Sequence, residues 1–110
     1  MTSPLVAYID VDDTLVRSFG SKRIPIPAMI EHVRSLRRSG VLLYCWSSGG
    51  ARYAEDSARE LGIAECFVGY LPKPNIIVDD MPLERWPKLL QVHPNQAVSK
   101  TMSDYEAILS

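Results

Sequence analysis

The chain has 110 residues, of which 46% are hydrophobic and 23% are charged, and its formal net charge is -1. These values are typical of one globular domain, residues 1–110, built around a single core. The near-neutral charge gives no indication of a nucleic-acid or acidic-membrane partner. The N-terminal segment lacks a basic stretch and reaches carboxylates after a short apolar run, so we expect neither a signal peptide nor a membrane span.

Four short apolar runs, at residues 5–9, 41–46, 66–68 and 76–78, predict β-strands. Their nearly continuous apolar character is typical of strands in a parallel sheet that is covered on both faces. Two segments between them have apolar residues at helical spacing and predict helices at 27–39 and 51–61. In the first of these, His32 is expected on the polar side. The alternation of strands and helices predicts a doubly wound, three-layer α/β/α domain with a mostly parallel sheet.

The remaining segments predict smaller elements. Residues 15–26 are long enough only for a hairpin around Gly20, and residues 69–72 for a small turn. Beyond Pro82 we expect a short helix at 83–90, interrupted at Pro87, and a terminal helix at 103–109 with Ser103 as its N-cap and Glu106 at the capping-box position. Cys45 and Cys66 stand in apolar runs and are expected to be buried free thiols, which favours a reducing, cytoplasmic setting.

Polar residues follow each predicted strand, at the edge where parallel sheets bind ligands. Carboxylates from two strand ends would make a hard oxygen site suited to Mg²⁺. A hydroxyl and glycines before a helix favour anions and allow close approach of a ligand. A lysine between two prolines is a rigidly placed cation that could neutralise a phosphoryl group. The residues concerned are Asp10, Asp12, Asp13 and Thr14 after the first run, Ser47, Ser48, Gly49 and Gly50 after the second, Lys73 after the third, and Asp79 and Asp80 after the fourth.

Each of these features has an ordinary structural explanation when taken singly. Acidic residues at a strand end are often part of a turn, Ser-Ser-Gly-Gly is often a loop with a helix cap, and a lone lysine is usually solvated. Their joint occurrence, in this order and each at a predicted strand end, is what favours phosphate chemistry.

The same residues resemble the four ordered motifs of the haloacid dehalogenase-like (HAD) hydrolases. Asp10-Val11-Asp12-Asp13-Thr14 is similar to the DxDxT signature, Ser47 to the second motif, Lys73 to the third, and Asp79-Asp80 to the acidic fourth motif. The resemblance covers residue 5 to about residue 80. It implies a Rossmann-like fold and a Mg²⁺-dependent phosphatase that works through an aspartyl-phosphate intermediate.

The resemblance implies a role for each matched residue. Asp10 would be the nucleophile and Asp12 the general acid and base. Ser47, Ser48 and Lys73 would hold the phosphoryl oxygens, and Thr14 would shape the loop. The metal would be bound by Asp10, by the backbone carbonyl of Asp12, and by Asp79 and Asp80, with Asp80 favoured over Asp79 as the direct ligand.

The chain departs from the family's pattern in three respects. Asp13 stands where many members have glycine, and the usual helix between the third and fourth motifs is missing, a form that resembles a short subgroup of these hydrolases. There is also no room for a cap domain, so the site is expected to be open. An open site suits a bulky phosphorylated substrate, or a small one enclosed by a second subunit in a homodimer.

Three other functions stay open at this point. A receiver-like phospho-acceptor domain uses similar residues, but in another order, and long-lived phosphorylation without turnover would reveal it. A catalytically silent binding or regulatory module could have the same fold. Dehalogenation within the same family would need no metal, so a metal requirement would distinguish it.

Overall fold

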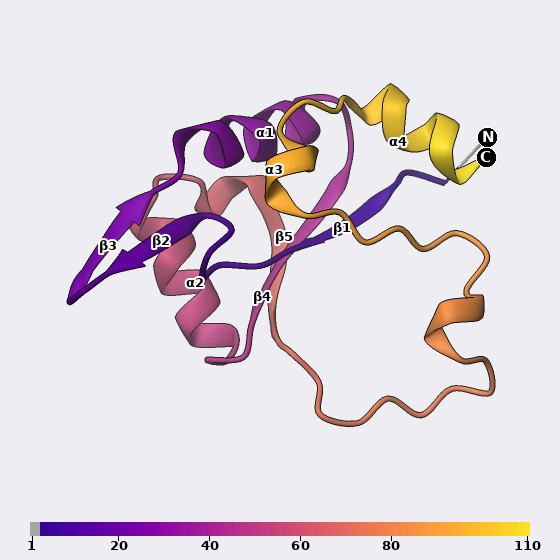
Figure 1. The fold of residues 1–110 in the computed structure, drawn as a ribbon, viewed down its shortest axis with the longest axis horizontal. Coiled ribbons are helices and arrows are strands. Elements are labelled where there is room, and N and C mark those ends of the chain that lie inside the picture. Colours follow the sequence, from indigo (N-terminus) through magenta and orange to yellow (C-terminus); the bar gives the residue numbers. More distant parts are fainter. Residues whose placement is uncertain (1–2) are drawn as a thin grey trace.

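The computed structural model describes residues 3–110 (Figure 1). The strands are β1 (Val6–Ile9), β2 (Val16–Phe19), β3 (Lys22–Pro25), β4 (Leu42–Ser47) and β5 (Phe67–Pro72). The α-helices are α1 (Pro27–Arg38), α2 (Ala51–Glu60), α3 (Pro94–Ala97) and α4 (Met102–Leu109), and the 3₁₀ turns are η1 (Ala64–Cys66) and η2 (Leu83–Arg85). None of the helices described is both long enough and apolar enough to span a membrane.

Three strands form a parallel sheet in the order β1–β4–β5. The register pairs Val6 with Leu42 and Ile9 with Cys45, and on the other side of β4 it pairs Ser47 with Pro72. The first three predicted strands and both predicted crossover helices are therefore confirmed. Residues 69–72, which were expected to form a turn, instead extend β5, because their backbone continues the ladder on β4.

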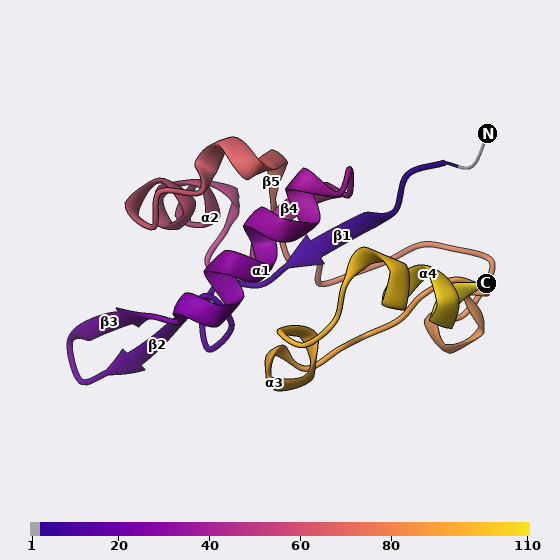
Figure 2. The same ribbon diagram turned by 90° about the horizontal axis from the view of Figure 1, so that it is seen from above.

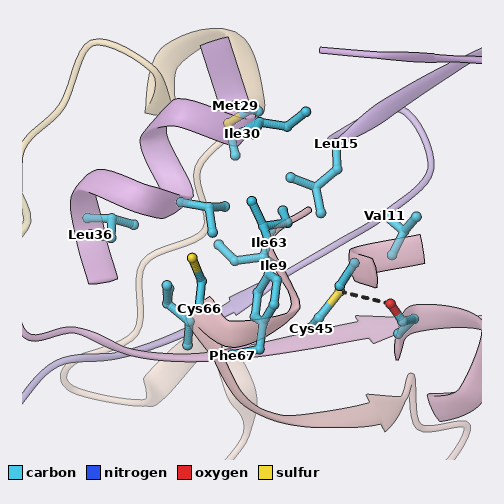
Figure 3. Packing of buried hydrophobic residues seen from close by; sticks show 14 of the residues in the cluster. Ile9, Val11, Leu15, Met29, Ile30, Leu36, Cys45, Ile63, Cys66 and Phe67 are labelled. Carbon is cyan, nitrogen blue, oxygen red and sulfur yellow. Dashed lines mark hydrogen bonds between the residues drawn. The ribbon is translucent and has the colours of Figure 1, made fainter. Parts of the chain in front are cut away.

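The core lies between one face of this sheet and the two crossover helices (Figure 3). Leu43 and Cys45 of β4 are fully buried, as are Val33 of α1 and Ala54 and Ala58 of α2. Alternate strand residues point to the opposite face, where Tyr8 is 48% exposed. The α/β class is thus confirmed, whereas the helices of the described part, residues 3–110, do not form the expected third layer.

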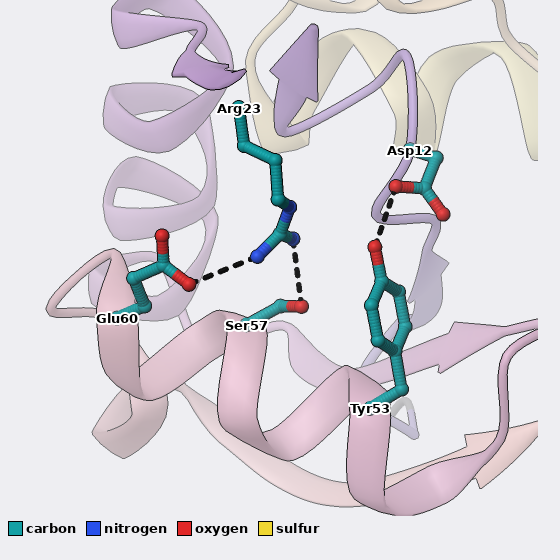
Figure 4. Close-up of polar contacts among 5 residues, drawn as sticks. All are labelled: Asp12, Arg23, Tyr53, Ser57 and Glu60. Carbon is teal, nitrogen blue, oxygen red and sulfur yellow. Dashed lines mark hydrogen bonds and ion pairs between the residues drawn. The ribbon is translucent and has the colours of Figure 1, made fainter. Parts of the chain in front are cut away.

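The predicted hairpin around Gly20 is confirmed as β2 and β3, paired from Val16–Pro25 to Phe19–Lys22. Figure 2 shows that it projects at the end of the molecule opposite α4. Arg23 holds the hairpin against α2, donating at 2.9 Å both to Ser57 Oγ and to Glu60 Oε2 (Figure 4). The hairpin is therefore anchored to the domain, while most of its other residues are exposed.

The fourth predicted strand is wrong. Residues 76–78 form no strand, and Ile76, Ile77 and Val78 are 81%, 51% and 95% exposed. After Lys73 the chain leaves the sheet in a wide loop and returns only near α3 (Figure 1). An apolar run predicts a strand only if a partner strand is available, and here the segment makes no ladder with β1.

The C-terminal region differs from the prediction in detail. Within residues 83–90 only η2 is helical, since Pro87 ends the helical turn. Helix α4 begins at Met102, so Thr101 is its N-cap, and Thr101 and Asp104 form the capping box that was assigned to Ser103 and Glu106. The Thr101 hydroxyl accepts from the Asp104 N–H at 3.2 Å.

His32 was expected on the solvent side of its helix, and that prediction is also wrong. Its side chain is only 6% exposed, and its Nε2 lies 3.0 Å from the hydroxyl of Tyr105 in α4. Helix α1 thus has a second buried stripe, which packs against the C-terminal segment. His93 is exposed as expected, and its Nδ1 caps α3 by accepting from the Asn95 N–H at 3.1 Å.

Candidate active site at the carboxyl edge of the sheet

Asp10 and Lys73 form an ion pair at the carboxyl ends of β1 and β5. Lys73 Nζ lies 3.1 Å from Asp10 Oδ1, with both side chains about one-third exposed. The strand between them fixes this geometry, because the Lys73 N–H donates to the Ser47 carbonyl at 2.9 Å. Three predicted residues from three strand ends therefore lie together, as parallel strands require.

The loop after β1 holds the Asp10 carboxylate from its other side. The Thr14 hydroxyl donates to Asp10 Oδ2 at 3.1 Å. The loop is tightly wound, since the Val11 carbonyl accepts from the N–H groups of Thr14, Leu15 and Val16. Asp13 has φ = 60°, a left-handed conformation that Asp tolerates better than most residues. The expected structural role of Thr14 agrees with this arrangement.

Asp12 is oriented by a residue that the sequence analysis did not identify. The Tyr53 hydroxyl donates to Asp12 Oδ1 at 2.7 Å, from the first turn of α2 (Figure 4). This hydrogen bond is the main reason why the pKa of Tyr53 is raised above its ordinary value. The tyrosine ring also lies against the Arg23 guanidinium, 5.3 Å from the ring centroid. Asp12 is therefore turned toward α2.

Gly49 and Gly50 stand before α2, and Gly49 makes room for this tyrosine. A Cβ at Gly49 would lie 2.9 Å from Tyr53 Cδ2, so a larger residue there would push the ring. Gly50 has φ = 106°, which side-chain-bearing residues rarely adopt. Ser47 is buried, with its hydroxyl accepting from the Gly49 N–H at 3.0 Å, and Ser48 is exposed. Ser47 thus reaches the site mainly through its backbone, and its hydroxyl proton is available for one further bond.

Asp79 and Asp80 are not brought to this edge. Both are exposed, and Asp79 Oδ1 accepts from the Met81 N–H at 2.9 Å in its own turn. Across residues 3–110, no group of three or more Asp, Glu, His or Cys side chains is arranged to hold a metal ion. The Asp10 carboxylate and the Asp12 backbone carbonyl are still oxygen donors of the kind that Mg²⁺ takes from a protein, where one or two carboxylates act together with water and substrate phosphate.

Cys45 lies beneath the site and is not part of its chemistry. Burial, together with the nearby charge of Asp10, raises the pKa of its thiol to about 12, so it stays protonated. Both cysteines are buried and free, as the sequence predicts.

Comparisons with family models, curated proteins and solved structures gave no match. The resemblance to the HAD hydrolases therefore depends on the sequence motifs, and the residues of the fourth motif do not lie at this edge of the sheet.

Proposed function

We propose that this protein is a phosphomonoester hydrolase in which Asp10 is the nucleophile. The observation that carries the proposal is the ion pair of Asp10 and Lys73 at 3.1 Å, with Thr14 holding the second carboxylate oxygen. A carboxylate held in place beside an ammonium group can attack phosphorus, because the ammonium neutralises the negative charge of the phosphoryl oxygens. The order β1–α1–β4–α2–β5 supports a Rossmann-like domain, since it is one half of a doubly wound fold.

The proposed reaction has two steps. An Asp10 oxygen forms a bond to phosphorus as the ester P–O bond breaks, and Asp12 gives its proton to the leaving oxygen. A water then attacks the aspartyl phosphate, loses a proton to Asp12, and releases phosphate with Asp10 regenerated. Tyr53 fixes the Asp12 side chain for both proton transfers.

The proposal includes Mg²⁺, which the Asp10 carboxylate and the Asp12 backbone carbonyl would hold and which would supply positive charge against the phosphate. Asp79 and Asp80 could join these ligands only if the segment after Lys73 folded back toward the carboxyl edge of the sheet. A cytoplasmic location belongs to the proposal as well, and the two free buried cysteines support it.

The test measures phosphate release from p-nitrophenyl phosphate with added Mg²⁺. We expect Asp10→Asn to lower kcat by about 10³-fold or more, because an amide is a poor nucleophile. Asp13→Asn is the matched control, since Asn also tolerates the left-handed backbone at this exposed position and the variant should keep the wild-type rate.

Two results would contradict the proposal: robust turnover by Asp10→Asn, or full activity in excess chelator. Stable labelling of Asp10 by acetyl phosphate without turnover would instead indicate a phospho-acceptor domain. A Mg²⁺ titration of Asp79→Asn and Asp80→Asn, each against wild type, determines whether either carboxylate contributes to metal affinity.

A further inference from the structure

The face of the sheet turned away from α1 and α2 carries a row of aromatic side chains. Tyr8, Tyr44 and Trp46 share this face, because Tyr8 is in register with Tyr44 and Trp46 is two residues further along β4. Tyr8 is 48% exposed, and the two β4 residues are half-buried. We refer to these three residues as the aromatic row.

The rings of the aromatic row are packed against one another. The centroid of the Tyr8 ring lies 4.9 Å from that of Trp46, with an interplanar angle of 78°. It lies 5.5 Å from that of Tyr44, with an interplanar angle of 52°. Gly69 on β5 leaves space for the Tyr44 ring, since a Cβ there would lie 3.3 Å from it. Tilted and edge-on pairs leave ring faces uncovered by their partners, and such faces can receive another planar group.

This row is continuous with the candidate active site. Ile9 pairs with Cys45, so Asp10 and Trp46 are the next residues along the two chains. Asp10 is two residues after Tyr8, and alternation along an extended chain directs it to the same face of the sheet. Lys73 joins the two, with Nζ 3.1 Å from Asp10 Oδ1 and 5.8 Å from the centroid of the Trp46 ring. The same ammonium therefore serves both the carboxylate and an aromatic ring.

We propose that the aromatic row binds the leaving group of the substrate, and that this group carries a planar aromatic ring. The inference rests on the proposed phosphatase function. A phosphate drawn to Lys73 would leave the rest of the ester over Trp46 and Tyr8, where a planar ring can stack. The net charge of -1 favours a small ester over a nucleic-acid chain. Two esters have this chemistry: phosphotyrosine, whose ring is bonded to the ester oxygen, and a nucleoside 5′-monophosphate, whose ring is one sugar away.

The test compares kcat/KM for AMP and phosphotyrosine with that for ribose 5-phosphate, which lacks the ring. We expect the wild type to favour at least one aromatic ester by about tenfold or more, and the better of the two identifies the source of the ring. Trp46→Leu should abolish the preference, whereas Trp86→Leu should keep it, because Trp86 lies in the loop beyond Lys73 and its indole N–H donates to the Met81 carbonyl of that same loop. The ratio of kcat/KM between two esters does not change when part of a variant is unfolded, because both values fall equally.

Equal kcat/KM for all three esters, or the same preference in Trp46→Leu as in wild type, would overturn the inference. Loss of turnover with every ester would instead indicate that the proposed function fails. A binding experiment then tests the inference separately. In Trp86→Phe the only tryptophan is Trp46. AMP or phosphotyrosine should quench the tryptophan fluorescence of this variant, and ribose 5-phosphate should not. No quenching by either, or dimerisation that buries Trp46, would exclude the aromatic row as a ligand site.

Discussion

Tyr53 has two contacts that one substitution can separate: its hydroxyl donates to Asp12 and its ring lies against Arg23. Phenylalanine keeps the ring against Arg23, 5.3 Å from its guanidinium, and loses the hydrogen bond to Asp12. We expect Tyr53→Phe to lower kcat about tenfold, the effect of one hydrogen bond to a charged group, while the thermal midpoint stays within a few degrees of wild type.

Steady-state kinetics and thermal unfolding check this prediction together. Tyr70→Phe is the matched control, because its hydroxyl donates at 2.9 Å to the Ala64 carbonyl and to no carboxylate. An unchanged kcat in Tyr53→Phe would show that Asp12 needs no partner. If kcat is unchanged and the thermal midpoint also falls by many degrees, the role of Tyr53 is purely structural.

At the residue scale, the sequence was most informative where chemistry and position along a strand coincide. Asp10 and Ser47 were predicted because each directly follows an apolar run, and Lys73 because it follows the third run across a short segment and stands between two prolines. Tyr53 was missed because its partner Asp12 is 41 residues away, and a tyrosine early in a helix has no pattern that predicts such a contact. Trp46 was counted only as part of an apolar strand, since its nearness to Lys73 depends on the pairing of β4 with β5.

Helix α1 shows how an element can be predicted correctly and still have one side misassigned. Its bounds were nearly those observed, Pro27–Arg38, because the apolar spacing and Pro27 at its first turn are local signals. His32 lies outside that apolar stripe, yet it is buried against Tyr105 of α4. Contacts with an element 73 residues later cannot be deduced from the periodicity of the helix itself.

The buried histidine makes the docking of α4 on α1 sensitive to pH. Burial lowers the pKa of His32 below its ordinary value of 6.5, so the folded chain takes up this proton less readily than the unfolded chain. The free energy of unfolding should therefore be unaffected by His32 above about pH 7 and fall as the pH drops below about 6.5. Urea unfolding at a series of pH values measures this dependence.

The two histidines of the chain provide an internal control for that experiment. His32→Gln should flatten the pH dependence between about pH 5 and 7, and His93→Gln, at an exposed position, should leave it as in wild type. Equal slopes for wild type and His32→Gln would show that His32 does not contribute to the pH dependence.

Over the whole molecule, the local elements were easier to predict than the sheet. The crossover helices and three strands follow from local apolar patterns, whereas the fourth strand required a particular long-range pairing. The run at 76–78 has the composition of a strand, but its three side chains are at least half exposed and the outer edge of β1 is unpaired in the described sheet. Composition indicates what a segment can form, and only the topology decides what it pairs with.

This arrangement predicts where a protease should cut the folded chain. Every residue from Pro74 to Gln91 is exposed, and a segment with few buried contacts opens at low cost. Brief digestion with trypsin should cleave first after Arg85 and Lys88, ahead of Arg34 in α1, which is half-buried. Lys73 should resist because Pro74 follows it. Mass spectrometry of the early fragments identifies the cut sites. Protection of both Arg85 and Lys88 would show instead that this segment packs against the domain, where Asp79 and Asp80 could approach Asp10.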